Sequence, residues 1–319
     1  MTVRRLSLAT LALLLGAMSC TADPTDGSDL DTTFSAQMAS TWHYVGTPQR
    51  VQIGVLANDA DGIRVVTQGT IDVAFAPLGD GGASGPPLTA NFVPVPGRDA
   101  SGDTPTIASG ANGVYEVNGV TFDTAGVWSA TISLEVDGVA RELNTDFEVL
   151  QDSPIPAPGM PAPATKTLTI GSKGVTDGAI DSMADVGGEI PDPELHEISI
   201  ADAIARGTPA LVLFGTPLHC TSRFCGPEVT ELQRFAAEYS DRAAYIHVEI
   251  WKEYQPERQV VNKGAADWLL WKRSDGTPEM TEPWLYLIDA EGIVAERWGP
   301  LFDISEVEAA LEALPPMDA

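Results

Sequence analysis

A run of five prolines in twelve residues, from Ser153 to Ala164, divides the chain of 319 residues into two parts. Each proline fixes its own φ angle and removes a backbone donor, so this run fits neither a helix nor the middle of a sheet. We therefore expect a semi-rigid linker with little packing along it. The linker and a polar, Gly/Asp-rich extended segment occupy residues 151–193, and the parts on either side are expected to fold as two domains.

Residues 34–150 have the pattern of an all-β domain, because short β-rich runs recur between turn signals. Asp-Ala-Asp-Gly at 59–62 and Val-Asp-Gly-Val at 136–139 provide such turns. The segment from Phe122 to Trp128 resembles the Asp-x-Ala-Gly-x-Tyr corner of immunoglobulin-like domains, with Trp in the place of Tyr and without their cysteine pair. The resemblance implies an immunoglobulin-like β-sandwich.

Residues 1–20 resemble the signal peptide of a bacterial lipoprotein. A basic start precedes an apolar run from Leu6 to Ala17, which is too short for a typical membrane-spanning helix. Small residues then precede Cys20, although Ala stands where that family usually has Leu. The resemblance implies export and a lipid anchor on Cys20 in a bacterial membrane, with residues 21–33 as a flexible tether. An ordinary signal peptide that happens to contain a cysteine is the alternative.

The composition excludes some classes of partner. The formal net charge is −27, and binding to nucleic acid needs a basic surface, so nucleic acid is excluded as a partner. A hydrophobic content of 44% with seven tryptophans is enough for folded cores. The acidic residues are scattered, which is typical of a soluble, self-repelling exported surface. We expect no cofactor, and the scattered acidic residues predict no metal site of clustered carboxylates.

Residues 194–319 alternate between strand and helix patterns, which predicts a three-layer α/β domain. The apolar periodicity predicts strands at 210–214, 243–250, 284–288 and 293–298, and helices at 198–206, from 229 onward and at 304–314.

Two of the three cysteines, Cys220 and Cys225, lie between an apolar strand and an amphipathic helix. In an oxidising compartment a disulfide between them can persist. The amides and the dipole of a helix N-terminus favour a thiolate, so Cys225 is expected to be reactive. His219 and Arg223 add nearby polarisable or positive charge, whereas an ionised Glu228 would oppose a thiolate and make Cys225 less acidic.

Phe224-Cys-Gly-Pro227 is similar to half of the thioredoxin motif, and the run from Thr281 to Gly292 looks like the cis-proline and central hairpin of that superfamily. The resemblance covers residues 198–314. It implies a thioredoxin-like domain in which Cys225 is the nucleophile and Pro283, in cis, lies beside the active sulfur. Glu228 stands where the family has its second cysteine, so Cys220 would be the resolving thiol.

Three functions follow from these residues. The favoured one is thiol–disulfide exchange with thiols or disulfides of an envelope protein. The second is a non-enzymatic binding or scaffolding lipoprotein in which Cys220–Cys225 is a permanent disulfide. The third is copper handling, because two thiolates and an imidazole select copper and His219 could be the third ligand. Of the other histidines, we expect His247 to be a satisfied core residue on a strand and His196 to be exposed.

Overall fold

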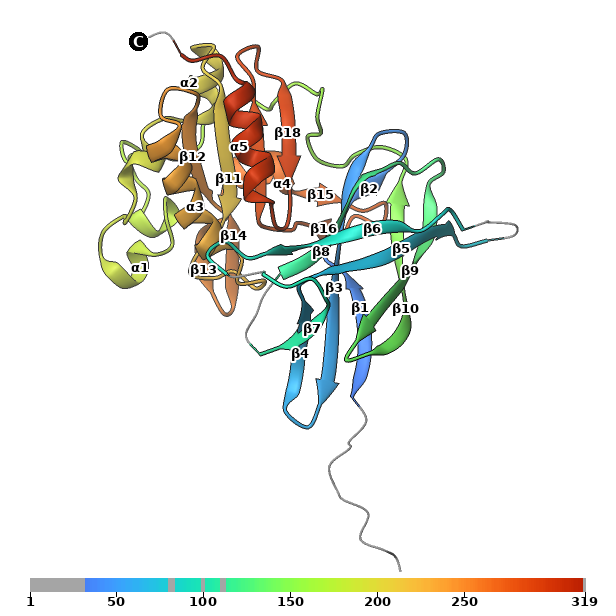
Figure 1. The fold of residues 1–319 in the computed structure, drawn as a ribbon. Coiled ribbons are helices and arrows are strands. Elements are labelled where there is room, and N and C mark those ends of the chain that lie inside the picture. The colour runs from blue at the N-terminus through green and yellow to red at the C-terminus, as the bar shows by residue number, and fades with distance from the viewer. Residues whose placement is uncertain (1–31, 80–83, 99–100, 110–112, 318–319) are drawn as a thin grey trace, which may run out of the picture.

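The computed structural model describes residues 32–79, 84–98, 101–109 and 113–317. The chain is mainly β, with 41% strand and 17% helix. A curled sheet of long strands lies beside a smaller sheet that carries most of the helices (Figure 1). The predicted signal peptide, Cys20 and nearly all of the predicted tether fall outside the described residues. Within the part of the chain that is described, no helix combines the length and apolar character needed to span a membrane.

The larger sheet contains ten strands among the described residues, in the order β2-β10-β9-β5-β6-β8-β3-β4-β7, with β1 paired to β3. Its pairs are antiparallel, apart from the short parallel pairing of β2 with β10. The strands are β1 (Thr33–Met38), β2 (His43–Tyr44), β3 (Gln49–Asp59), β4 (Gly62–Thr67), β5 (Thr70–Pro77), β6 (Leu88–Pro94), β7 (Thr106–Ala108), β8 (Gly113–Val120), β9 (Gly126–Val136) and β10 (Val139–Leu150).

The curl of this sheet encloses one aromatic core centred on Phe122. Its ring lies edge-on to Trp128 at a centroid distance of 5.0 Å and is tilted against Phe147 at 5.6 Å. Such tilted contacts place the positive ring edge against the negative ring face. The Trp128 Nε1–H donates to the carbonyl of Thr124 at 3.0 Å and so closes the corner before β9. The apolar faces of the strands thus meet inside one curled sheet.

The predicted immunoglobulin-like sandwich is therefore wrong. A sandwich needs two sheets packed face to face. Here hydrogen bonds connect all ten strands, β1 through β10, into a single sheet. The alternation of apolar and polar residues in a strand specifies which face is buried. It does not specify whether the covering residues come from a second sheet or from the curl of the same sheet.

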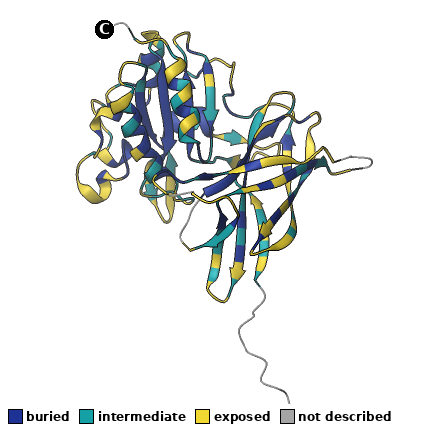
Figure 2. Ribbon diagram, viewed as in Figure 1, coloured by how far each residue is buried: buried dark blue, intermediate teal, exposed yellow. Residues whose placement is uncertain are grey.

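The smaller sheet has the order β12-β11-β17-β18, with β11 parallel to β12 and antiparallel to β17. Its strands are β11 (Ala210–Gly215), β12 (Ala244–Glu249), β17 (Trp284–Ile288) and β18 (Val294–Trp298). Residues of α2 (Ile200–Ala205) and α4 (Lys263–Leu269) pack on one face, and residues of α3 (Cys225–Glu238) and α5 (Ile304–Ala313) pack on the other. The strands β11, β12 and β17 between these layers are almost wholly buried, and the edge strand β18 is partly exposed (Figure 2). The predicted strands and helices of this region are confirmed to within a few residues.

The predicted pair of an immunoglobulin-like domain and a thioredoxin-like domain is nevertheless wrong, because the chain as a whole is predominantly β with curled sheets and few helices. Between β12 and β17 the chain forms two further small antiparallel sheets and only one helix, of seven residues. The strands of these small sheets are β13 (Trp251–Gln255), β14 (Arg258–Val261), β15 (Trp271–Lys272) and β16 (Pro278–Glu279). Before α2 the chain also forms the short helices η1 (Asp177–Ala179), α1 (Ala184–Gly187) and η2 (Pro193–His196). Periodicity identified single elements but not these added strands, whose short runs lack a clear period. The predicted domain boundaries at residues 150 and 194 stay predictions.

The Pro-rich segment also differs from expectation, because it packs along its length. The Gly159 N–H donates to the carbonyl of Val294 at 2.8 Å, and the Ala162 N–H donates to that of Gly292 at 2.9 Å. Ile155 is buried in the same region. Prolines lack donors, but the residues between them can pair with the edge of a sheet, which is where proline is tolerated. The segment therefore lies against the edge strand β18.

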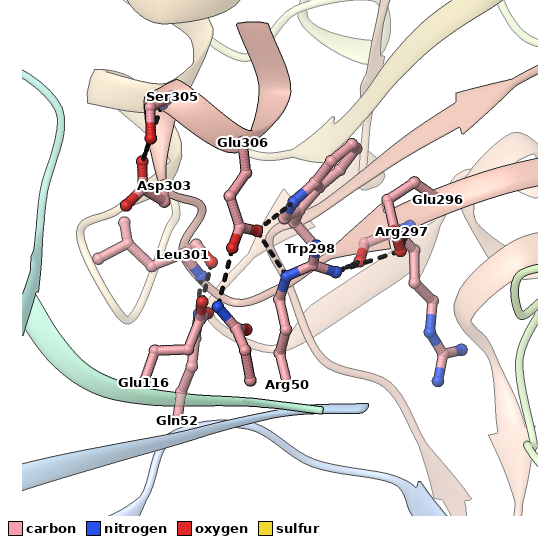
Figure 3. A network of polar contacts seen from close by, with 11 residues as sticks. Arg50, Gln52, Glu116, Glu296, Arg297, Trp298, Leu301, Asp303, Ser305 and Glu306 are labelled. Carbon is pink, nitrogen blue, oxygen red and sulfur yellow. Dashed lines mark hydrogen bonds and ion pairs between the residues drawn. The ribbon is translucent and has the colours of Figure 1, made fainter. Parts of the chain in front are cut away.

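Polar contacts join the two sheets (Figure 3). The Arg50 guanidinium on β3 donates to Glu306 at 2.7 Å and to Glu296 at 3.1 Å. The buried Gln52 side chain donates to the carbonyl of Leu301 at 2.6 Å and accepts from the Leu301 N–H at 3.3 Å. A side-chain amide that satisfies both backbone groups of one residue fixes the register of this contact.

Glu116 lies beneath this junction, and the Gln52 Nε2–H donates to its carboxyl group at 2.6 Å. Burial raises the pKa of Glu116 to about 7, although the hydrogen bond from Gln52 acts in the opposite direction. Because the folded state binds this proton more tightly than the unfolded state, stability falls as pH rises from the unfolded pKa toward 7.

We predict that Glu116→Gln stabilises the chain at pH 8 by roughly 1–3 kcal/mol and flattens the decline between about pH 4.5 and 7. Urea unfolding across that range measures the effect. Glu135→Gln, which changes an exposed residue of β9, is the matched control and should follow the wild type. A steeper decline in Glu116→Gln would contradict the prediction.

Candidate functional site

A disulfide between Cys220 and Cys225 marks the candidate site, in the loop between β11 and α3. Cys225 is the first residue of α3 and is 0% exposed, whereas Cys220 is partly exposed. The Cys225 N–H donates to Cys220 Sγ at 3.3 Å, and the Ser222 hydroxyl lies 3.3 Å from the same sulfur. The sulfur that faces outward is therefore the one that two polar groups contact.

The end of β11 forms the floor of the site. A Cβ placed on Gly215 would lie 3.4 Å from Cys225 Cβ and 3.7 Å from its Sγ, so backbone and disulfide are in close contact. Phe214 pairs with Trp284, which puts Pro283 at the same end of the neighbouring strand. The Glu282–Pro283 peptide bond is cis, as predicted. Pro283 thus lies on the strand end next to the one that supports Cys225.

Glu228 is buried one turn into α3, and burial raises its pKa well above the usual range for a carboxyl group. Its Oε1 has no hydrogen-bond partner among the described residues. Burial therefore favours the neutral form of this carboxyl group. The repulsion between Glu228 and a thiolate that the sequence predicts requires the ionised form, so burial weakens it.

His219 and Arg223 flank the disulfide on the loop. The His219 ring stacks on Tyr254 of β13, with centroids 3.9 Å apart and planes 12° apart. Arg223 is exposed and has a φ of 67°, the left-handed conformation that turns the chain into α3. The structure thus brings Cys220, Cys225 and His219 together. The copper function predicted for these three residues stays a prediction.

The larger sheet braces the site from two sides. Phe224, which precedes Cys225, packs against an apolar cluster that includes Val93 and Val114. On the other side Trp42 stacks on Trp284, with centroids 6.1 Å apart and planes 5° apart. A pocket of about 200 Å³ opens beside Phe224 and is also lined by Met38, Leu56, Val65 and Ser222. The disulfide loop is therefore held between the two sheets.

Four buried polar residues form a second cluster, namely Asp181, Asp192, His196 and His247. The His247 Nε2–H donates to the carbonyl of Gly215 at 3.3 Å, so the cluster adjoins the strand end that supports Cys225. His196 is only 1% exposed, which contradicts the predicted exposure. His247 is buried on β12 as predicted, but its Nδ1 has no hydrogen-bond partner among the described residues, so it is not the satisfied core histidine that was expected.

Sequence reasoning missed this cluster because three of its members lie in or beside the segment interpreted as linker. Asp192 and His196 are four residues apart, and Asp181 precedes Asp192 by eleven. This spacing is the one indication of the cluster in the sequence. It indicates a site only once the fold places His247 of β12 beside these three residues.

Comparison of the chain with protein-family profiles, with curated proteins and with solved structures finds no match. The chemistry of both clusters must therefore be argued from the residues themselves.

We predict that Glu228→Gln removes a loss of stability that accompanies rising pH. The raised pKa means that the folded state keeps its proton to higher pH than the unfolded state, so stability falls from the unfolded pKa upward until pH passes the folded pKa. Guanidinium unfolding from about pH 4 to about pH 10 measures this loss. Glu257→Gln, an exposed change on the neighbouring hairpin, is the control and should retain the wild-type profile. An unchanged pH profile in Glu228→Gln would contradict the prediction.

Proposed function

We propose that the chain carries out thiol–disulfide exchange with a partner protein, using Cys220–Cys225 as a reversible redox pair. The observation that carries this proposal is the asymmetry of the two sulfurs. Cys220 is partly exposed and Cys225 is 0% exposed at the start of α3. An exchange pair needs one sulfur that a partner can reach and a second that is released in a protected place.

The exposure favours Cys220 as the reactive sulfur, which is the reverse of the order implied by the resemblance. A partner thiolate attacks Cys220 Sγ, a bond forms between these sulfurs, and the Cys220–Cys225 bond breaks with its electron pair on Cys225. A second thiolate of the partner then attacks the partner's sulfur in the mixed disulfide. This forms the partner's disulfide and releases the Cys220 thiolate. The partner loses two electrons and two protons, and the pair gains them. The reverse sequence reduces a partner disulfide.

The start of α3 favours the release of Cys225. The helix dipole stabilises a thiolate at its N-terminus, and a leaving thiol of lower pKa leaves faster. Burial raises the pKa of Glu228 and favours its neutral form, which does not oppose that thiolate. The Cys225 N–H, 3.3 Å from Cys220 Sγ, also points at the sulfur that would attack a partner disulfide.

The pocket beside Phe224 and Ser222 provides a binding surface next to Cys220, and it is lined by the disulfide loop and by residues of the larger sheet. This supports a role for the larger sheet in partner binding as well as in bracing the loop. The N-terminal sequence predicts export and a lipid anchor, so the proposed partner is an envelope protein with accessible thiols or a disulfide.

The order of attack is tested with single-cysteine variants. Cys225→Ser retains the accessible Cys220 and should react with a small aromatic disulfide at least about tenfold faster than Cys220→Ser, because burial restricts attack by Cys225. Absorbance of the released thiol gives the rate, and mass spectrometry identifies the mixed disulfide. In denaturant the two variants should react alike. Equal rates in the folded state would contradict the proposed order and favour Cys225 as nucleophile.

The reduction potential separates exchange from a permanent disulfide. We expect a value for the Cys220–Cys225 pair between about −120 and −270 mV, the range of exchange proteins. Equilibration with glutathione or dithiothreitol buffers, followed by thiol alkylation, measures it. A potential below about −300 mV would identify a structural disulfide and overturn the proposed function.

A further inference from the structure

The buried cluster of Asp181, Asp192, His196 and His247 has the composition and shape of a metal site. Asp181 follows η1, Asp192 and His196 bracket η2, and His247 lies on β12. The side chains of all four are 0% exposed. One nitrogen or oxygen atom from each residue lies within 4.8 Å of the corresponding atoms of the other three. Three chain segments therefore converge on a single point.

Hydrogen bonds within the protein do not account for these groups. Both ring nitrogens of His196, both carboxylate oxygens of Asp192 and the Asp181 Oδ2 have no hydrogen-bond partner in the part of the chain that is described. Asp192 occupies the N-cap position of η2, yet its side chain accepts no capping hydrogen bond from the residues described there. A buried charge without partners is strongly destabilising. The cluster is thus incomplete as a set of protein contacts.

The separations fit a metal better than they fit ion pairs. His247 Nδ1 lies 3.3 Å from Asp181 Oδ2, and His196 Nε2 lies 3.7 Å from the same oxygen and 3.6 Å from Asp192 Oδ1. Charge-assisted hydrogen bonds between such groups are about 2.7–2.9 Å long. Zinc with bonds of about 2.0–2.1 Å in tetrahedral geometry separates its ligand atoms by about 3.3–3.4 Å.

Neighbouring groups orient two of the ligands. The Met183 N–H donates to Asp181 Oδ1 at 2.7 Å, which leaves Oδ2 directed at the two rings. The Nε2–H of His247 donates to the Gly215 carbonyl at 3.3 Å, so Nδ1 carries the free lone pair. Ligands of bound metals are typically held in this way by a hydrogen bond from the atom that does not bind the metal.

We propose that Asp181 Oδ2, Asp192 Oδ1, His196 Nε2 and His247 Nδ1 bind one zinc ion. Two carboxylates and two neutral imidazoles around Zn²⁺ make a site of zero net charge, which removes the penalty of two buried carboxylates. Four protein ligands close the coordination sphere, so the ion is structural. It ties the segment around η1 and η2 to β12. The site contains no sulfur and is independent of the proposed exchange at Cys220–Cys225.

Zinc content tests the site in the full chain with its disulfide oxidised, so that no thiolate competes. After incubation with zinc and removal of the excess, elemental analysis should give one zinc per chain. Asp192→Asn keeps the size of the side chain but loses the charge, and it should weaken zinc binding at least about tenfold in competition with a chelator. Two variants serve as controls and should retain wild-type affinity: Asp185→Asn, the same change at an exposed position four residues from Asp181, and His219→Ala beside the disulfide.

Cobalt provides a second measurement that does not depend on any variant. Co²⁺ in place of zinc should give the intense visible bands of a four-coordinate ion without charge-transfer bands from thiolate. Chelator treatment should lower the melting temperature of the wild type by several degrees and leave Asp192→Asn almost unchanged. A wild-type chain that binds no zinc, or a zinc ion whose affinity falls in His219→Ala but not in Asp192→Asn, would overturn the proposal.

Discussion

The candidate site depends on the contacts that Gly215, at the end of β11, makes with Cys225 and His247. The Cα of Gly215 faces Cys225, so that a Cβ placed there would be in van der Waals contact with the Cys225 side chain, and its carbonyl accepts the hydrogen bond from His247. One residue thus supports the disulfide on one side and orients a buried histidine on the other. Movement of this strand end would alter both clusters together.

The larger sheet acts on the site from a distance. On β3, Arg50 binds Glu306 of α5 and Gln52 binds the backbone of Leu301. Phe224 packs against residues of the larger sheet, and Trp284 stacks on Trp42 in the loop that follows β1. The contacts of Gln52 and Glu116 are buried, where hydrogen bonds are stronger and unpaired groups more destabilising than at the surface. They hold the two sheets in one arrangement, and the disulfide loop lies where the sheets meet.

Local features were predictable because their causes are local. The strands around β11 and β17 follow from continuous apolar runs, the start of α3 from Gly226 and Pro227, and the pairing of Cys220 with Cys225 from their short separation. The curled sheet, the packing of the Pro-rich segment and the burial of His196 were not predictable. Each depends on residues that are far apart in sequence, and no pattern within a single segment records them.

The sequence by itself determined the main strands and helices around β11 and β17, that two cysteines lie at the start of a helix, and that the chain is strongly acidic. These are properties of composition and of neighbouring residues. Only the tertiary structure decided which sulfur is accessible, that burial raises the pKa of Glu228, and that Asp181, Asp192, His196 and His247 meet. Exposure, pKa and ligand geometry depend on what surrounds a group in space, and here the surroundings come from distant parts of the chain.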